Sequence, residues 1–274
     1  MTLNCNGNLI DLSLPRIMGI LNVTPDSFYD GGHYTSERAI LMQVEKMLTE
    51  GATFLDVGGY SSRPGASEVS ESEEIKRVVP VIDTITKSFP ETIISVDTFR
   101  SKVAKAAVEA GATIVNDISA GNLDLKMMET VTVLQVPYIM MHMKGTPQTM
   151  GHETQYKNVT KEVIFYFSEK LAEARKLGIN DLVIDPGFGF AKNISQNFEL
   201  FHHLQLFKNL EVPTLIGISR KSMIYKTLKI TSEEALNGTT ALHSIALLKG
   251  ANILRVHDVK EAMECVKLVE NFKI

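Results

Sequence analysis

The stretch TIISVDTFRSKVAKAAVEAGATIVNDIS (92–119) contains one complete unit of the fold. It begins with a short apolar run, 92–98, that ends in polar residues. A segment of helical length, 101–112, follows, with apolar residues at helical spacing and a glycine near its end. A second apolar run, 113–119, completes the unit. Two buried strands separated by a helix are typical of parallel strands joined by a crossover.

The same pattern repeats along the whole chain of 274 residues. Segments 36–52 and 160–179 are further amphipathic helices. Six further apolar runs, together with the two runs above, predict eight strands. Eight strands that alternate with helices indicate a (β/α)8 TIM barrel of the α/β class. A doubly wound open sheet is the alternative, but no G-x-G-x-x-G follows the first strand. The other six apolar runs are 16–22, 53–59, 137–143, 181–187, 213–219 and 252–258.

The chain shows no low-complexity linker, so we expect residues 1–274 to form a single domain. Before the first barrel strand, the segment 5–13 contains an Asn6-Gly7 pair between two short runs. Asn-Gly favours the tight turn of a β-hairpin. The sequence therefore predicts a short N-terminal β-hairpin that covers the floor of the barrel.

Composition excludes several classes of function. The net charge of −4 does not favour a protein that binds nucleic acid through bulk electrostatics. No apolar run reaches the roughly 18 residues of a membrane span, and the first residues lack the pattern of a signal peptide. Cys5 and Cys265 lie at opposite ends of the chain and predict reduced thiols rather than a disulfide. We therefore expect a cytoplasmic protein that binds neither membranes nor nucleic acid.

Polar side chains stand at or near the ends of nearly all predicted strands. In a barrel of this kind the active site lies at those carboxyl ends. A single polar residue at a strand end is usually a helix cap, but capping does not explain so complete a set. On the last strand Arg255 and His257 share a face, because residues two apart on a strand do so. The strand-end set is Asn22, Asp56, Asp97, Asn116, Asp185, Ser219 and His257.

These side chains divide into two chemical groups. Asp97, Asn116 and Asp185 offer acceptors for a heterocycle that carries amino and ring N–H groups. A second group offers cationic donors for phosphate or carboxylate. A ligand with an amino-heterocycle at one end and an anion at the other fits both groups. The cationic group consists of Arg63, Lys221, Arg255 and His257.

Three other signals carry little weight. His202 and His203 are adjacent on a predicted helix and point in different directions, which does not favour a shared metal. The GFGF of 187–190 lacks the lysine and hydroxyl ending of a phosphate-binding loop. The chain has no H-E-x-x-H and no C-x-x-C, so a dedicated zinc site is not expected.

The motifs taken together resemble the dihydropteroate synthase family of folate biosynthesis along nearly the whole chain. Eight stretches carry the resemblance, in that family's order and at compatible spacing. They are GILNVTPDSFYDGG, DVGGYSSRPGA, ISVDT, IVNDIS, HMKGTP, IDPGFGFAKN, SRKSMI and RVHDV. The resemblance implies a barrel enzyme that joins 6-hydroxymethyl-7,8-dihydropterin diphosphate to 4-aminobenzoate and releases pyrophosphate. It also implies a homodimer and a target of sulfonamides, which mimic aminobenzoate.

The resemblance assigns roles residue by residue. The pterin ring is held by Asp97, Asn116, Asp185, Lys221, Met140, Phe190 and Arg255. The diphosphate is bound by Asn22, Arg63, Arg255 and His257, with Mg²⁺ as cofactor between Asn22 and phosphate oxygens. Aminobenzoate lies against Phe28, Ser62, Pro64, Phe190, Lys221 and Ser222. Lys221, Asp97, Arg255 and Arg63 are the expected catalytic residues.

Two rival functions use the same kind of barrel. A methyltransferase that binds methyltetrahydrofolate shares the acidic pterin pocket but has no need of SRKSM or Arg63. A non-catalytic pterin-binding paralogue is expected to lose some of the cationic residues, and this chain keeps them all. The chain departs from the family at Tyr29, Tyr60 and Tyr225, and these departures bear on how the first two loops close over the product.

Overall fold

Eight parallel strands form a nearly closed barrel in the computed structural model, which describes residues 1–23, 33–60 and 69–272. Their order is β8-β7-β6-β5-β4-β3-β10-β9, and a bridge between Ile184 and Thr214 connects the two edges. The predicted (β/α)8 barrel is therefore confirmed. The strands are β3 (Arg16–Asn22), β4 (Phe54–Gly58), β5 (Ile93–Asp97), β6 (Ile114–Asp117), β7 (Tyr138–Met141), β8 (Leu182–Asp185), β9 (Leu215–Ile216) and β10 (Ile253–Val256).

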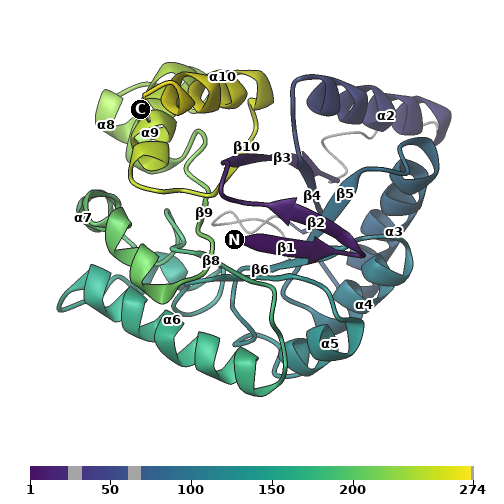
Figure 1. Cartoon of the computed structure of the whole chain (residues 1–274), viewed down its shortest axis with the longest axis horizontal. Coiled ribbons are helices and arrows are strands. Elements are labelled where there is room, and N and C mark those ends of the chain that lie inside the picture. Colours follow the sequence, from purple (N-terminus) through teal and green to yellow (C-terminus); the bar gives the residue numbers. More distant parts are fainter. Residues whose placement is uncertain (24–32, 61–68, 273–274) are drawn as a thin grey trace.

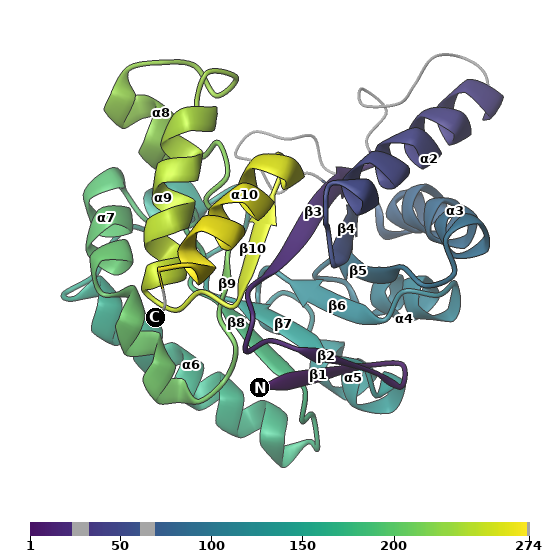
Figure 2. The same ribbon diagram turned by 45° about the horizontal axis from the view of Figure 1, so that its top comes forward.

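Helices surround this barrel on its outside (Figure 1 and Figure 2). The two helices that correspond to the predicted segments 36–52 and 160–179 begin and end within three residues of those bounds. The α-helices are α2 (His33–Thr49), α3 (Glu71–Ser88), α4 (Ser101–Glu109), α5 (Met127–Leu134), α6 (Val159–Lys176), α7 (Ile194–His202), α8 (Ser222–Leu228), α9 (Leu236–Leu248) and α10 (Val259–Glu270). Two 3₁₀ helices, η1 (Met150–His152) and η2 (Leu204–Leu210), complete the described helices.

The strand β9 is much shorter than the predicted run 213–219. Its ladder ends at Ile216, and Gly217 begins a segment that leaves the sheet for the mouth of the barrel. Side-chain pairing replaces part of the missing ladder, because Asn252 Oδ1 accepts a hydrogen bond from the Thr214 amide at 2.9 Å. Hydrophobic patterning predicted the buried run but not where its backbone bonds stop.

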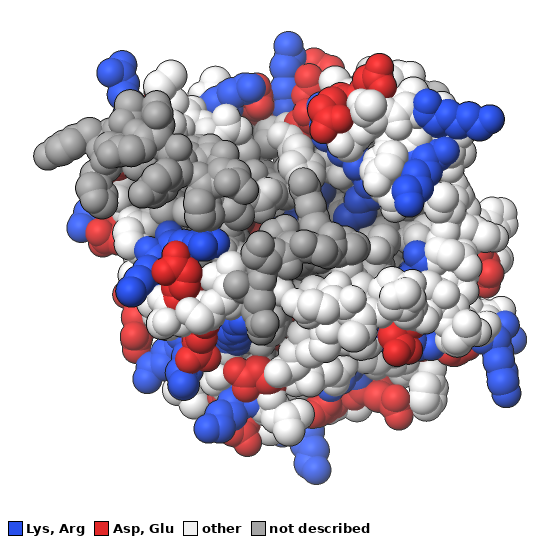
Figure 3. All heavy atoms as spheres, turned by 180° about the vertical axis from the view of Figure 1, so that it is seen from behind, with Lys and Arg blue, Asp and Glu red and all other residues white. Residues whose placement is uncertain are grey.

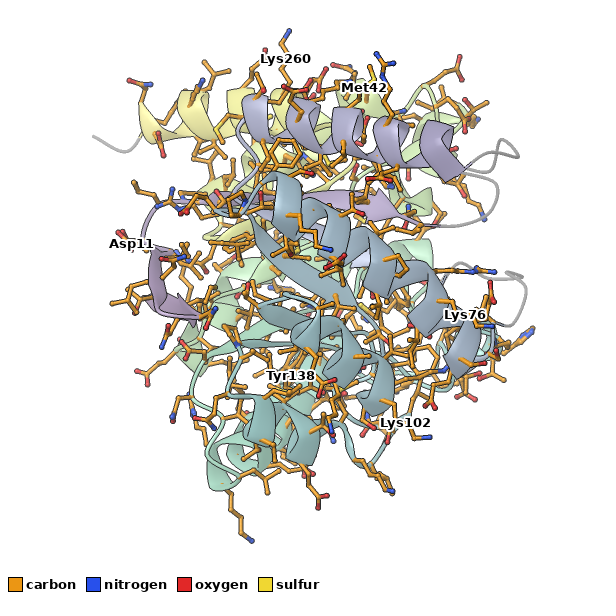
Figure 4. The ribbon with its side chains drawn as sticks, turned by 90° about the vertical axis from the view of Figure 1, so that its right-hand side faces the viewer. Asp11, Met42, Lys76, Lys102, Tyr138 and Lys260 are labelled. Carbon is orange, nitrogen blue, oxygen red and sulfur yellow. The ribbon has the colours of Figure 1, made fainter. Side chains whose placement is uncertain are left out.

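The N-terminal hairpin covers one end of the barrel, as predicted (Figure 1). Strands β1 (Thr2–Cys5) and β2 (Asn8–Asp11) are joined by Asn6 and Gly7, both with positive φ, as the tight turn requires. Their apolar side chains pack on a layer formed by the first inward residue of each barrel strand. Figure 4 places Asp11 of this hairpin at one end of the molecule and Lys76 and Lys102 at the other.

Side chains alternate between two cores. Along β4, Phe54 belongs to the layer inside the barrel, whereas Leu55 and Val57 belong to the larger core between the sheet and the helices. Tyr138, labelled inside the ribbon of Figure 4, is fully buried and donates a 2.6 Å hydrogen bond to Asp117. Because side chains alternate along each strand, a polar residue two positions after a member of the inner layer also faces inward.

The glycine near the end of the predicted segment 101–112 has a steric role. Gly111 follows α4 with φ of +117°, and a Cβ at that position would lie 2.6 Å from Thr86 Oγ1 of α3. Only glycine fits there, because both its backbone conformation and its contact with α3 exclude a side chain. The end of α4 and the packing of α3 against α4 are therefore fixed by one residue.

The outer surface carries charges of both signs. Figure 3, the view from behind Figure 1, shows Lys and Arg interspersed with Asp and Glu on that face. Cys5 and Cys265 are both buried free thiols. Among the helices of the described ranges, none is long and apolar enough to cross a bilayer.

We expect His243 to make the fold sensitive to acid. This α9 side chain is 1% exposed, neither ring nitrogen has a hydrogen-bond partner among the described residues, and burial lowers its pKa to about 4. The unfolded chain therefore binds a proton below pH 6.5 that the folded chain does not bind until near pH 4. Stability present above pH 6.5 is lost as the pH falls, by about 2 kcal/mol at pH 5.

Urea unfolding of His243→Leu at pH 7.5 and pH 5 measures this loss, with His202→Leu, an exposed histidine of α7, as the control. The His243→Leu protein should lose about 2 kcal/mol less between the two pH values than the wild type does. An equal loss in both proteins would contradict the role of His243.

Candidate active site

The mouth of the barrel, at the carboxyl ends of the strands, carries a layer of polar side chains. Asp56, Asp97, Asn116, Asp185 and Arg255 each lie two or four residues after an apolar member of the inner layer on the same strand. They therefore face inward, above that apolar floor. Asn22 faces the same way, four residues after Met18 on β3, and it is exposed. The strand-end prediction is thus correct in position for these residues.

Arg255 joins three strands of the barrel. Its Nε donates to Asp56 Oδ2 at 2.5 Å, and its Nη2 donates to Asp97 Oδ2 at 2.6 Å. Asn116 Nδ2 donates to the same Asp56 oxygen at 3.0 Å. Asp56 is fully buried, and its other oxygen has no hydrogen-bond partner among the described residues. Strands β4, β5, β6 and β10 are therefore connected at the mouth by one charged network.

The network shifts the protonation of its members. Burial raises the pKa of Asp97 to about 7; Arg255 opposes this shift, and Asp56 adds to it. Burial alone would lower the pKa of Arg255, but Asp56 and Asp97 outweigh it, so this pKa lies above its ordinary value. The arginine stays cationic at any physiological pH, whereas Asp97 can exchange a proton near neutrality.

A second cluster lies across the mouth. Lys221 Nζ donates to the Phe188 carbonyl at 2.6 Å and lies 4.9 Å from the centre of the Phe190 ring. Burial lowers the pKa of Lys221 to about 8, against the attraction of Asp185. Burial raises the pKa of Asp185, against the attraction of Lys221. Asp185 Oδ1 also accepts a 2.8 Å hydrogen bond from the Gly187 amide.

Gly217 leaves the space between these two clusters open. A Cβ at this position would lie 3.7 Å from both Asp185 Oδ2 and Lys221 Nζ, and 4.0 Å from the Arg255 Cβ. Any side chain on such a Cβ would occupy the volume that the three charged groups face. The sequence analysis did not single out this glycine, although a glycine inside an apolar strand is a signal of close approach.

His257 lies beside the network at the end of β10. Its Nδ1 is 3.0 Å from Ser219 Oγ, and its backbone amide donates to the same oxygen at 3.3 Å. Behind it, Arg220 Nε and Nη2 donate to the two oxygens of Asp258 at 2.8 and 2.9 Å. This fork holds the neighbours of Lys221 and His257 in fixed positions. Ser222 is half-buried at the first turn of α8.

Met140 does not line the mouth, and its assignment to the ligand pocket is wrong. It is fully buried in the core between sheet and helices, on the same face as Tyr138. Met141 points inward instead and packs with Ile118 in an apolar cluster that Phe190 joins. A one-residue error on a strand moves a side chain to the opposite face. Met141 and Ile118 are wall residues that the motif comparison missed.

Four predicted ligand contacts lie outside the described residues. Phe28, Ser62, Arg63 and Pro64 belong to segments 24–32 and 61–68. Their assigned roles stay predictions. Tyr60, just before the second segment, accepts a 2.9 Å hydrogen bond from Gln148 and makes an edge contact with Phe99.

A metal site at the mouth would depend on Asn22, which the resemblance assigns to it. In the part of the chain that the structure describes, no three His, Cys, Asp or Glu side chains gather as ligands. The exposed amide of Asn22 offers one hard oxygen at the mouth, and a cation with mostly water and substrate ligands needs no more. The donor set fits magnesium better than zinc.

The arrangement suits a flat, donor-rich ring with an anionic substituent. Each side of the mouth combines acceptors with a cation: Asp56, Asp97 and Asn116 stand with Arg255, and Asp185 stands near Lys221. Apolar walls come from Met141, Ile118 and Phe190. Such a site can bind a polar heterocycle edge-on in the barrel while it stabilises negative charge nearer the rim.

Comparison with known proteins agrees with this geometry. Residues 18–257 match the family described as pterin binding enzyme. A dihydropteroate synthase of Escherichia coli K12 is 44% identical over 272 residues, which cover 98% of this chain and 96% of that protein. The Yersinia pestis dihydropteroate synthase, solved with a sulfonamide drug, has a TM-score of 0.93 and 41% identity, covering 100% of this chain and 99% of that one. The Xanthomonas albilineans enzyme, solved with 4-aminobenzoic acid, has a TM-score of 0.92 and 39% identity, with coverage of 99% and 98%.

Removing the cation at the centre of the network should destabilise the protein strongly. In Arg255→Met, Asp56 and Asp97 lose their shared partner, which should cost about 3–5 kcal/mol of unfolding free energy. Adding Asp56→Asn should recover part of this loss, because it removes one of the two carboxylates that Arg255→Met leaves unpaired. Urea unfolding of the two single variants and the double variant forms the cycle. Strictly additive effects would show that the pair is not coupled.

Proposed function

The chain belongs to the dihydropteroate synthase family of pterin-binding enzymes, and we propose that the site described above performs that family's reaction with the residues assigned here. The reaction is the condensation of 6-hydroxymethyl-7,8-dihydropterin diphosphate with 4-aminobenzoate, a transferase step of folate biosynthesis. The arylamine nitrogen bonds to the methylene carbon, the bond from that carbon to the diphosphate oxygen breaks, and the nitrogen loses a proton. The products are 7,8-dihydropteroate and pyrophosphate.

The pterin ring lies deep in the barrel in this proposal. Its amino and ring N–H groups donate to Asp97 and Asp185, and Asn116 supplies an amide beside them. Met141 and Ile118 form one wall, and Phe190 contributes from the loop after β8. Asp56 lies behind these groups, fully buried, and holds both Arg255 and Asn116.

The cationic side chains serve the leaving group. As the bond to diphosphate breaks, negative charge grows on its oxygens and positive charge spreads into the pterin. Arg255 is fixed by two carboxylates and contributes a preorganised charge, and His257 joins it from the same strand. Arg63 belongs to this group by its motif alone. Carboxylates below the ring favour its cationic form.

Aminobenzoate lies nearer the rim. Ser222 and Lys221 stand at the first turn of α8, where a carboxylate finds backbone N–H groups and a cation. The ring of Phe190 supplies an apolar surface, with Phe28, Ser62 and Pro64 expected beside it. An arylamine is neutral at pH 7, so the attacking nitrogen needs little help from a general base.

One observation carries the proposal. Arg255 holds Asp56 and Asp97 on one side of the mouth, while Asp185 and Lys221 face the same opening across Gly217. Acceptors for the ring and cations for the diphosphate are thus present within one space. A catalytically silent paralogue has no reason to keep both sets.

Magnesium is the cofactor that we propose. Asn22 would hold it with one amide oxygen, and water and diphosphate oxygens would supply the other ligands. The bound ion would neutralise charge on the diphosphate. With a single protein ligand, the ion should bind weakly until the substrate is present.

We also propose a cytoplasmic homodimer. On α9, Ile245 and Leu248 are 40% and 56% exposed, while their neighbours Ala246 and Leu247 are buried, so the helix presents a second apolar face. Two copies could cover such a face. The two free thiols suit a reducing compartment. Light scattering measures the mass in solution, and cell fractionation measures the compartment.

The test is a pyrophosphate-release assay with dihydropterin diphosphate, 4-aminobenzoate and Mg²⁺. Wild-type protein should turn over, and Lys221→Ala should lose about 2–4 kcal/mol of transition-state stabilisation, about 30- to 900-fold in kcat/KM. Lys226→Ala, an exposed lysine of the same helix, is the control and should keep wild-type kcat/KM. Folded wild-type protein without turnover would refute the function, and a fully active Lys221→Ala would refute the role of Lys221.

A neighbouring pair of methionines tests the pocket wall. Met141→Ala should weaken the binding of dihydropterin diphosphate by about 5- to 30-fold, because apolar contact with the ring is lost. Met140→Ala should cost about 2–5 kcal/mol of stability and leave this affinity unchanged. Calorimetric titration of both variants decides between the two faces of β7. A larger affinity loss in Met140→Ala would reverse the assignment.

Removal of divalent cations tests the metal. Chelation should abolish pyrophosphate release, and added Mg²⁺ should restore it. Asn22→Ala should need a higher Mg²⁺ concentration for half-maximal rate, whereas Asn8→Ala on the hairpin at the far end of the barrel should not. An unchanged Mg²⁺ dependence in Asn22→Ala would remove this residue from the metal site.

A further inference from the structure

Lys192 is a buried cation that the reaction does not use. It follows the GFGF segment and is 7% exposed. Its Nζ lies 2.9 Å from the Gly187 carbonyl, 3.0 Å from the Phe190 carbonyl and 3.0 Å from His142 Nδ1. The His142 carbonyl is more distant, at 3.5 Å. None of these partners is a carboxylate. Burial lowers the pKa of Lys192 to about 7, and the attraction of Asp185 does not outweigh it, so ion pairing does not explain why an amine is buried here.

The three close partners match the three protons of an ammonium group. Two of these partners are carbonyl oxygens. The third, His142 Nδ1, must then accept a hydrogen bond from the ammonium group, which places the imidazole proton on Nε2. Burial keeps the pKa of His142 well below its usual range, so the ring is neutral and able to accept. The ring also makes an edge contact with Tyr166, at 4.8 Å between centroids. The lysine thus ties the segment after β7 to the loop after β8.

That loop contains two groups of the proposed pterin pocket. Its Phe188 carbonyl accepts from Lys221, and its Phe190 ring lies under the same ammonium group. Two other carbonyls of the loop, on either side of Phe188, accept from Lys192. The loop therefore lies between two lysines, one facing the ligand space and one behind it.

The loop has little freedom to move toward the strand. Gly187 has φ of +71°, and a Cβ there would lie 2.1 Å from the His142 carbonyl. On the other side, the Gly189 amide donates to Asn197 Oδ1 at 2.7 Å. Without the ammonium group, the Phe190 carbonyl would lose the donor that the described residues give it, and the Gly187 carbonyl would keep only the Phe190 amide, at 3.1 Å, so the loop would have to move to satisfy Phe190.

We propose that Lys192 is a positioning residue for the pterin pocket, acting through its hydrogen bonds to the 187–190 loop to fix Phe190 and the carbonyl that orients Lys221. This inference deepens the proposed function and rests on it. A purely structural position would be filled at lower cost by an apolar side chain, since a buried amine that hydrogen-bonds no carboxylate loses its hydration. Here the lost hydration of the Lys192 amine is offset by the hydrogen bonds that fix the geometry of the pocket.

The test measures the affinity for dihydropterin diphosphate, by calorimetry and without aminobenzoate, in Lys192→Met. We expect a loss of about 10-fold or more, because the ring face and Lys221 are no longer held. Lys170→Met, a half-buried lysine of α6, and Val163→Ala, a core cavity of the same helix, are the controls. Both should bind as wild type, so that lowered stability alone does not produce the effect.

A double-mutant cycle tests whether Lys192 affects the binding of dihydropterin diphosphate through Phe190. In a Phe190→Ala background, Lys192→Met should cost less affinity than it does in the wild type, because one of the groups that it positions is already gone. Lys192→Gln, which keeps two donor protons, should fall between wild type and Lys192→Met. It also serves as the variant to measure if Lys192→Met does not fold.

Three results would overturn the inference. The first is wild-type affinity in folded Lys192→Met, and the second is a full affinity loss in the Phe190→Ala background. The third, where only Lys192→Gln folds, is wild-type affinity in that variant. Wild-type protein that neither binds dihydropterin diphosphate nor releases pyrophosphate would refute the proposed function instead, and that result is visible before any variant is made.

Discussion

The pairing of Arg255 with Asp56 and Asp97 is the constraint on which the mouth of the barrel depends. Three charged groups within hydrogen-bond distance, Asp56 fully buried and Asp97 and Arg255 partly buried, are costly unless each is matched, and here one guanidinium matches two carboxylates from two other strands. The match requires β10, β4 and β5 to keep one register. Asn116 of β6 donates to the same Asp56 oxygen, so the network also fixes the position of the Asn116 side-chain amide. The polar layer is thus a single network rather than a set of separate side chains.

The rest of the architecture supports this network from below and from outside. The hairpin closes the floor with Leu3, Cys5 and Leu12 against the inner apolar layer, which keeps water from the buried charges on that side. The helices fill the outer core, so each strand has one fixed face for the mouth. Loops after the strands then carry the groups that meet the ligand. The loop of 187–190 is the clearest case, because Lys192 and Lys221 hold its carbonyls from opposite sides.

Some of the site could be read from residue types alone. Asp97, Asn116, Asp185 and Arg255 were predicted because polar residues at the ends of apolar strands converge in a barrel, and the structure places all four at the mouth. Met140 was assigned by motif and was wrong by one position, since period two reverses the face of a strand. Gly217 gave a signal, a glycine inside an apolar run, that the sequence analysis did not use. Lys192 gave none, because its role depends on the atoms that surround it. Phe28, Ser62, Arg63 and Pro64 keep their predicted roles by motif.

The sequence by itself determined the barrel, the hairpin and the chemical character of the site. These follow from local patterns: the spacing of apolar runs, the Asn6-Gly7 turn and the polar residue that ends each strand. Only the tertiary structure decided which carboxylate pairs with Arg255, which methionine faces the ligand and what a buried lysine holds. Those facts depend on distances between residues up to 199 positions apart in the chain. No local pattern records such distances, because they are set by how the strands and loops pack together.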